Sequence, residues 1–87
     1  MRQQLTALRE IGYANNVRRG ERDYHVQTEI MTFRDIKIKT TIHLKGTLVD
    51  ALAQVVEVEQ DLIRKVKDTA IRQHNGAVES VRLGKYD

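Results

Sequence analysis

Two histidines and a glutamate are the side chains in this sequence best suited to bind a metal ion or exchange protons. His25 and Glu29 lie in the stretch DYHVQTEI at residues 23–30, and His43 lies in a second stretch of the same alternating kind. Imidazole and carboxylate groups bind Zn²⁺, and imidazole exchanges protons near neutral pH. If His25 and His43 face each other on adjacent strands, their Cβ atoms lie about 5 Å apart and the pair can share a metal ion, with Glu29 as a third ligand. Histidines on an exposed sheet face are more often solvated, so we expect no metal site and keep these three residues as the candidates for one.

Other catalytic chemistries lack their residues. The sequence has no cysteine, which excludes disulfides, thiolate metal sites and cysteine nucleophiles. Its glycines stand without the G-x-G or G-K-[ST] arrangement that cradles a phosphate, and Ser80 is not part of a G-x-S-x-G turn. His74, beside Gln73 in a helical stretch, is predicted to be a boundary histidine capped by a backbone carbonyl or water. We therefore expect no cofactor, no catalytic residue and no enzymatic activity.

The composition is that of a small globular protein. Of 87 residues, 40% are hydrophobic and 31% are charged, which indicates one compact core rather than a disordered chain. The sequence begins with MRQQ and has no apolar run long enough for a signal peptide or a membrane span. We therefore expect a single domain over residues 11–87 that is soluble and cytoplasmic and has no membrane partner.

Positioning these side chains requires strands, and the turn residues indicate where the strands end. Gly20 and Gly46 each stand between stretches that alternate apolar and polar residues. Glycine supplies the positive φ angle that a two-residue hairpin turn requires. A third turn is expected at residues 33–35. Three hairpins in series predict a four-stranded antiparallel meander over residues 11–56.

The middle hairpin has a register that its own alternation fixes. Opposite residues of an antiparallel pair share a face, and a slip of one residue mixes the apolar and polar sets. With the turn centred on Arg34, the apolar face pairs Tyr24 with Leu44, Val26 with Ile42, Thr28 with Thr40 and Ile30 with Ile38. The polar face pairs His25 with His43, Gln27 with Thr41, Glu29 with Lys39 and Met31 with Lys37.

The outer strands follow from the other two turns. The Gly20 hairpin is predicted to pair Tyr13 with Val26 and Ile11 with Thr28. The Gly46 hairpin is predicted to set Val49, Ala51, Ala53 and Val55 opposite Ile42, Thr40, Ile38 and Ile36. Leu48, Leu52 and Val56 then point to the opposite, exposed face of this edge strand. Exposed aliphatic side chains on an edge strand favour pairing with another chain, so these three residues are the predicted interface.

A helix is predicted to cover the apolar face of the sheet. Apolar residues recur at three- and four-residue spacing at Leu62, Ile63, Val66 and Ala70, which is typical of an amphipathic helix. The predicted fold is α+β, a four-stranded antiparallel meander with one long C-terminal helix, residues 58–82, packed on one face. Residues 1–10 are expected to form a short helix or a frayed end.

A second arrangement fits the periodicity nearly as well. Thr47 followed by Asp50 resembles a capping box, and the apolar spacing after it can continue as one helix over residues 47–74. Asn75 and Gly76 would then end that helix, and residues 77–83 would form a last strand. The result is an α-ββ-α-β order of elements, and the periodicity alone leaves both arrangements open.

Three motifs give a resemblance to a known family. The stretch YHVQTE, the stretch IKTTIHLKG, and a Gln-His pair followed by GKYD occur in order over residues 11–87. Together they resemble a family of short uncharacterised bacterial proteins with a Tyr-His-Val-Gln-Thr-Glu strand and a C-terminal helix that closes on Gly-x-aromatic-Asp. The resemblance implies that residues 47–56 form a strand and that the last helix continues through Gly76 towards Leu83. The chain departs from the family pattern at residues 30–32, and the resemblance implies no function.

The sequence favours two functions, and the first is a small interaction or regulatory domain. A core of this size is marginal alone, since each buried apolar side chain contributes about 1.5–3 kcal/mol against about 1–2 kcal/mol per ordered residue. A homodimer or another protein partner at the last strand would bury more apolar surface and so add to the marginal stability of the core. The alternative is weak electrostatic nucleic-acid binding, because the net charge is +3. The residues predicted for it are Arg18, Arg19, Arg22, Lys37, Lys39 and Lys45.

Overall fold

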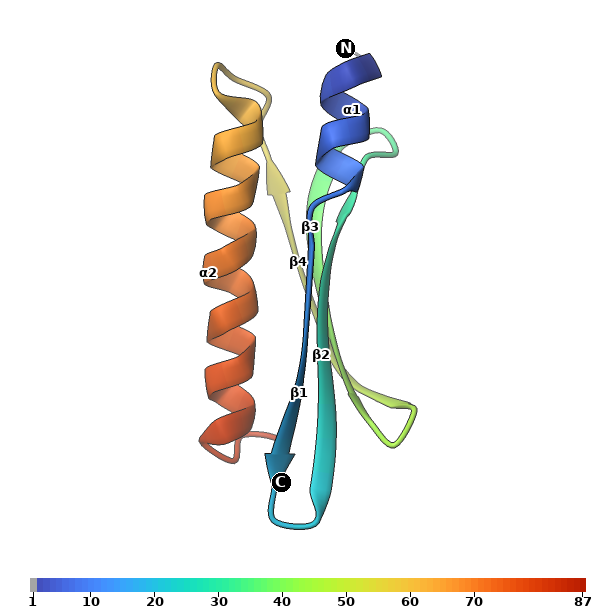
Figure 1. The fold of residues 1–87 in the computed structure, drawn as a ribbon, viewed down its shortest axis with the longest axis vertical. Coiled ribbons are helices and arrows are strands. Elements are labelled where there is room, and N and C mark those ends of the chain that lie inside the picture. The colour runs from blue at the N-terminus through green and yellow to red at the C-terminus, as the bar shows by residue number, and fades with distance from the viewer. Residues whose placement is uncertain (1) are drawn as a thin grey trace.

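The chain forms one sheet and two helices. The structure, a computed structural model, describes residues 2–87, with side chains from residue 5 onward. The elements in chain order are α1 (Arg2–Arg9), β1 (Gly12–Arg19), β2 (Arg22–Met31), β3 (Ile36–Leu44), β4 (Thr47–Val56) and α2 (Leu62–Arg82). Figure 1 shows α2 running the length of the sheet, with α1 at one end. For residues 1–10 the sequence left a short helix or a frayed end open, and Arg2–Arg9 form the helix α1.

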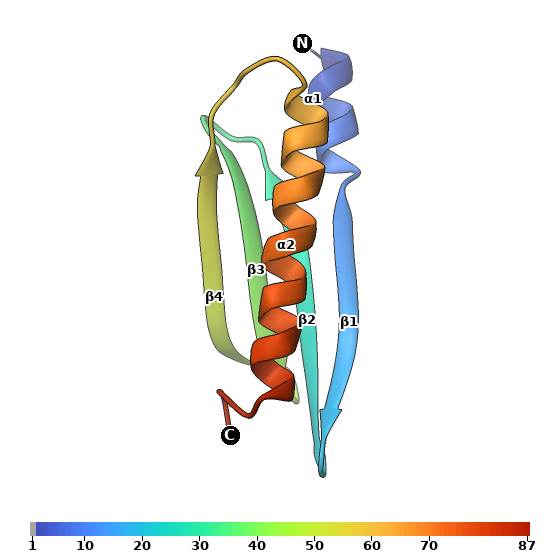
Figure 2. The same cartoon turned by 90° about the vertical axis from the view of Figure 1, so that its left-hand side faces the viewer.

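Only one face of the sheet carries a helix. The strands are antiparallel in the order β1-β2-β3-β4. α2 packs on β1, β2 and β3, and Figure 2 shows β4 beyond the edge of the helix. We call the side covered by α2 the inner face and the opposite side the outer face. The predicted α+β meander with a long C-terminal helix is confirmed.

The alternative α-ββ-α-β order is wrong. Residues 47–56 form β4, which pairs with β3, and residues 77–83 belong to α2 and the turn after it. α2 passes through Gly76, where glycine costs about 1 kcal/mol relative to alanine. Ala77, Val78 and Val81 beyond it are buried, and their burial outweighs that cost.

The sequence predicted the register of the β2–β3 hairpin correctly but not that of the β1–β2 hairpin. The β2–β3 register is confirmed over its whole length, from Tyr24 opposite Leu44 to Met31 opposite Lys37. The β1–β2 register is two residues from the prediction, because Tyr13 lies opposite Thr28 rather than Val26. Gly20, with φ +62°, takes the first position of the two-residue turn instead of the second. A shift of two residues keeps every side chain on its predicted face.

A β-bulge reverses the predicted faces of β4. Next to the turn His43 lies opposite Leu48, but Ile42 lies opposite Asp50, so Val49 is an extra residue in β4. One extra residue shifts the alternation, and every β4 residue beyond it changes face. Leu52 and Val56 therefore point to the inner face. The bulge therefore puts Asp50, Leu52, Gln54 and Val56 on the inner face in place of the predicted Val49, Ala51, Ala53 and Val55.

The core consists of two apolar clusters under α2. The cluster near α1 is formed by Leu8, Ile11, Ile30, Ile36, Ile38, Val56, Leu62, Val66 and Ala70. The cluster near the C-terminus is formed by Val17, Tyr24, Val26, Ile42, Ala77, Val78 and Val81. Leu8 of α1 is fully buried, so α1 belongs to the same core as the sheet. Polar side chains separate the two clusters.

Candidate functional site

A layer of hydrogen-bonded polar side chains crosses the middle of the core. This polar layer consists of Asn15, Thr28, Thr40, Gln73 and His74. Thr28, Thr40 and His74 are almost completely buried, at 1%, 0% and 3% exposure. Each lies between residues of the two apolar clusters along its own strand or helix. The layer therefore joins β1, β2, β3 and α2 at one level of the fold.

His74 lies at the centre of the layer, with a partner on each ring nitrogen. Its Nδ1 lies 2.8 Å from the hydroxyl of Thr28, and its Nε2 lies 2.6 Å from Oδ1 of Asn15. An amide oxygen only accepts, so Nε2 carries the proton and Nδ1 accepts from Thr28. The ring of Tyr13 lies against the same imidazole, with centroids 5.8 Å apart. The predicted backbone or water partner of His74 is thus wrong, because two side chains occupy the ring.

The direction of the remaining hydrogen bonds follows from the neutral imidazole. Since Thr28 donates to His74, its oxygen accepts from the hydroxyl of Thr40, 2.7 Å away. Thr40 in turn accepts from the side-chain amide of Gln73 at 2.9 Å. A protonated His74 would donate to Thr28 and leave one of the two threonine hydroxyl hydrogens without an acceptor. Burial, which lowers the pKa of His74, acts in the same direction.

The layer also reaches the far edge of the sheet. The amide of Gln73 donates to the carbonyl of Ile38 at 3.1 Å, and Gln54 of β4 donates to the side-chain oxygen of Gln73. Among the described residues, no buried side-chain nitrogen or oxygen lacks a hydrogen-bond partner. Because protein groups occupy both nitrogens of His74, the layer offers no free acid or base to a substrate. Its arrangement stabilises the packing of α2 on the sheet.

The end of the chain forms a second polar cluster, which we call the C-terminal clasp (residues 84–87). Asp87 accepts hydrogen bonds from the hydroxyl of Tyr24, at 2.9 Å, and from the guanidinium of Arg19. Tyr86 donates its hydroxyl to Asp50 at 2.7 Å. The clasp therefore contacts the first hairpin through Asp87 and the bulged end of β4 through Asp50.

These contacts shift the acidities of the clasp residues. The hydrogen bond from Arg19, followed by the one from Tyr24, lowers the pKa of Asp87. The hydrogen bond from Tyr86 lowers the pKa of Asp50, and the backbone N–H of Ala51 adds to it. Burial raises the pKa of Tyr86 to about 12, with a further contribution from Asp50. All three shifts favour the protonation states that hold the clasp closed at neutral pH.

The candidate metal ligands lie on the outer face. His25 and His43 are directly opposite each other on β2 and β3, as predicted, and both are half-buried. Glu29 lies four residues from His25 on the same strand, which corresponds to about 13 Å. It is too far to share an ion with both histidines. Within residues 5–87, no three histidine or carboxylate side chains gather into a metal-binding group.

Of the three predicted interface residues, only Leu48 is exposed as expected, at 55%. Leu52 is half-buried against the C-terminal apolar cluster, and Val56 is buried in the other cluster. The prediction that Leu52 and Val56 face solvent is therefore wrong, because the bulge turns them inward. The exposed aliphatic residues of β4 are instead Leu48, Val49 and Val55.

The predicted basic residues do not form one surface. Arg19 and Arg22 are engaged with Asp87, and Arg18 lies 4.0 Å from Asp23. Lys45 is in the β3–β4 turn, at the same end of the sheet as the first hairpin. Lys37 and Lys39 lie on the outer face of β3, towards the opposite end, and both are exposed. The structure thus divides the predicted nucleic-acid residues between the two ends of the sheet.

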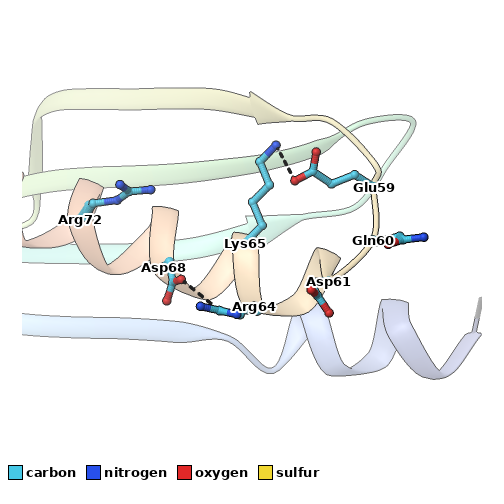
Figure 3. A pocket seen from close by; sticks show the side chains of 7 residues that line it. All are labelled: Glu59, Gln60, Asp61, Arg64, Lys65, Asp68 and Arg72. Carbon is cyan, nitrogen blue, oxygen red and sulfur yellow. Dashed lines mark ion pairs between the residues drawn. The ribbon is translucent and has the colours of Figure 1, made fainter.

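The surface depression drawn in Figure 3 lies along α2 and is lined by charged side chains of both signs. Lys65 pairs with Glu59 at 3.1 Å, and Arg64 lies 3.9 Å from Asp68. Both pairs bring charges of opposite sign together (Figure 3). This depression has the character of a solvated helix surface rather than of a binding site.

No family model, no curated protein and no solved structure matches this chain. The family resemblance of the three motifs therefore stays a prediction. No helix in the described part of the chain is long and apolar enough to cross a membrane.

Two groups of residues were not identified from the sequence. Thr28 and Thr40 stand at inward positions of strands that are otherwise apolar there, and that interruption was the available signal. The Tyr-Asp end entered only through the family resemblance, and His74 beside Gln73 was interpreted as a boundary histidine of the helix. Their partners come from four different elements, so no local pattern joins them.

Proposed function

We propose that this protein is a small, non-catalytic interaction domain that self-associates through the free edge of β4. The observation that carries the proposal is the composition of that edge. β4 is an edge strand of ten residues, and residues 51–56 contain no charge and no proline. Natural edge strands are usually protected by lysine, proline or a covering element, and these residues have none of them.

Exposed apolar side chains lie along the same strand. Leu48 is 55% exposed, Val49 38% and Val55 56%. α2 packs on the other three strands and leaves β4 beyond its edge (Figure 2). Both the backbone edge and the outer face of β4 are therefore open to a second chain.

A second copy of the chain suits this edge. Antiparallel pairing of β4 with itself is symmetric, so one two-fold axis at the middle of the strand relates the two copies. Asp50 is the only charged residue of β4, and it lies near the turn, held by Tyr86. Pairing centred on Ala53 sets Asp50 opposite Val56 of the other copy, so no like charges meet. The two sheets would continue as one.

The test uses a charge at the centre of the edge and a matched charge on the other edge. Ala53→Glu places a carboxylate opposite Lys39 within the monomer, which favours folding, but beside its own copy in the dimer, which opposes association. We expect the dimer dissociation constant to rise about tenfold or more, equal to about 1.4 kcal/mol, in sedimentation equilibrium. Ala14→Glu puts the same change on the exposed outer side of β1 and should leave association unchanged.

Two outcomes would contradict the proposal. The first is a wild-type chain that stays monomeric throughout the concentration range. The second is an equal loss of association in both variants. Thermal unfolding of each variant separates lost association from lost folding.

Nucleic-acid binding is the second candidate, and the exposure of Lys37 and Lys39 favours it. Within the described side chains neither lysine forms an ion pair. Two lysines give a small electrostatic footprint, and the engagement of Arg19 and Arg22 with Asp87 reduces it further. Affinity for a duplex that falls steeply with salt and is lost in the Lys37→Ala, Lys39→Ala double variant would favour this candidate over self-association.

A further inference from the structure

We propose that His25 and His43 form a two-imidazole site for a divalent transition metal ion of the Zn²⁺ type on the outer face of the sheet. The proposal is independent of self-association, because it concerns the two central strands and not β4. The two histidines are opposite each other on β2 and β3. Opposite residues of an antiparallel pair have Cβ atoms about 4.5–5.5 Å apart, which lets two imidazoles meet at one ion.

The ring of His25 is already oriented. Its Nδ1 lies 2.8 Å from Oδ1 of Asn16, the residue opposite it on β1. An amide oxygen only accepts, so Nδ1 carries the proton and Nε2 keeps a free lone pair. The two nitrogens of an imidazole point in widely divergent directions. With Nδ1 directed to β1, Nε2 therefore points away from β1, towards the side on which β3 and His43 lie.

Asn16 thus stands where metalloproteins place a supporting acceptor. Metal-binding histidines almost always donate their second N–H to a carboxylate, a carbonyl or water, which fixes the tautomer and the ring. His25 is on a central strand that pairs on both sides, so its backbone is held as well as its ring. The site needs no rearrangement of β2.

His43 is free to serve as the second ligand. Within the described side chains neither of its ring nitrogens forms a hydrogen bond, although the residue is half-buried. It also lies at the β-bulge, where the register of β3 with β4 shifts between Ile42 and His43. Bulges redirect neighbouring side chains and recur beside functional sites. Leu48 lies opposite His43 on β4, so one wall of the site is apolar.

The surroundings decide which ion fits. The next row of the outer face is neutral, with Gln27 opposite Thr41. In the other direction Asp23 lies next on the strand, near Arg18. Two imidazoles and no nearby thiolate suit Zn²⁺, Cu²⁺ or Ni²⁺, whereas Mg²⁺ and Ca²⁺ require oxygen ligands. Water would fill the remaining positions, as in sites that exchange or bind a further ligand.

The third histidine supplies an internal control. In an NMR titration of the full chain with ZnCl₂ at about pH 7.5, we expect the ring signals of His25 and His43 to shift together, with one ion per chain. His74 should not shift, because Asn15 and Thr28 occupy its nitrogens. His43→Ala should abolish the response of His25, and Asn16→Ala should weaken Zn²⁺ binding by about tenfold or more.

Three results would overturn the site. One is the absence of any shift of His25 and His43 in excess ZnCl₂. Another is undiminished binding by the His25→Ala, His43→Ala double variant, which would indicate adventitious ions elsewhere. The last is one ion per two chains, which would place the metal between molecules. Circular dichroism of each variant checks that the sheet is intact.

Discussion

β1 and β4 are the two edge strands of one sheet, and they differ in the contacts that their side chains form. β1 contacts α2, and three of its side chains have partners: Asn15 contacts His74, Asn16 contacts His25, and Arg19 pairs with Asp87. β4 lies beyond the helix and is uncharged over residues 51–56. Both strands expose unpaired backbone groups along one side, so the difference lies in what surrounds them.

The contrast indicates how association can stay limited. A sheet with two free edges can add copies at both ends and grow into a filament, whereas a sheet with one free edge closes after a single symmetric pairing. The surroundings of β1 therefore affect the extent of association as much as the open side of β4 does. Besides pairing with β2, β1 contacts the polar layer through Asn15 and the clasp through Arg19, and each of these contacts can be removed separately.

The largest effect is expected at the centre of the polar layer. His74→Ala removes a buried side chain and leaves Thr28 and Asn15 without their partner, so we expect the free energy of unfolding to fall by about 2–4 kcal/mol. Urea denaturation measures this change. His25→Ala on the outer face is the comparison, and it should cost less, about 0.5–1.5 kcal/mol, because it removes one exposed hydrogen bond, to Asn16. Equal losses in the two variants would contradict the structural role of the layer.

Acid should weaken the same contact in the unaltered protein. Burial lowers the pKa of His74 from its ordinary value of 6.5. Just below pH 6.5, His74 is therefore protonated in the unfolded chain but stays neutral in the folded chain. The contribution is complete above pH 6.5 and is lost as pH falls towards the folded pKa, at up to about 1.4 kcal/mol per pH unit. Asp50 and Asp87, with pKa values below the ordinary 3.8, add their losses only in stronger acid.

Urea unfolding at a series of pH values from neutral to mildly acidic measures how the free energy of unfolding depends on pH. His74→Gln, which has no titrating group, should flatten this dependence. A slope that persists in His74→Gln would assign the dependence to another group.

The smallest effect is expected at the bulged end of β4. Tyr86→Phe removes the hydroxyl that donates to Asp50, and we expect a loss of about 1 kcal/mol in the free energy of unfolding. Tyr13→Phe is the matched control, because within the described side chains the Tyr13 hydroxyl has no hydrogen bond, and its loss should be near zero. Differential scanning calorimetry of the two variants compares them directly. A larger loss from Tyr13→Phe would contradict the clasp.

The sequence predicted the centre of the fold better than its edges. β2 and β3 alternate without interruption on both sides of one turn, so only one register keeps the two faces apart. β1 is less patterned, and any shift by two residues satisfies its alternation equally. The bulge at Val49 leaves no mark in composition, yet it changes the face of every later residue in β4. That single residue is why Leu52 and Val56 were assigned to the wrong side.

The candidate sites show the same limit. The pairing of His25 with His43 followed from alternation, because both belong to the central strands. The polar layer and the clasp join residues of β1, β2, α2 and the chain end, which are far apart in sequence. Such contacts depend on how α2 lies across the sheet, and periodicity along one element carries no information about that.

The polar layer also favours the observed register of the β1–β2 hairpin over registers shifted by two residues. Slips by an even number of residues keep apolar side chains inward, so the apolar clusters alone discriminate poorly between them. A two-residue slip of β1 would move Asn15 about 7 Å along the strand, away from His74. The imidazole N–H would then be buried among apolar groups without a partner, at a cost of about 1–3 kcal/mol. The hydrogen bond between Asn15 and His74 thus forms in only one register of β1 with β2. The polar layer therefore specifies a single fold as well as stabilising it.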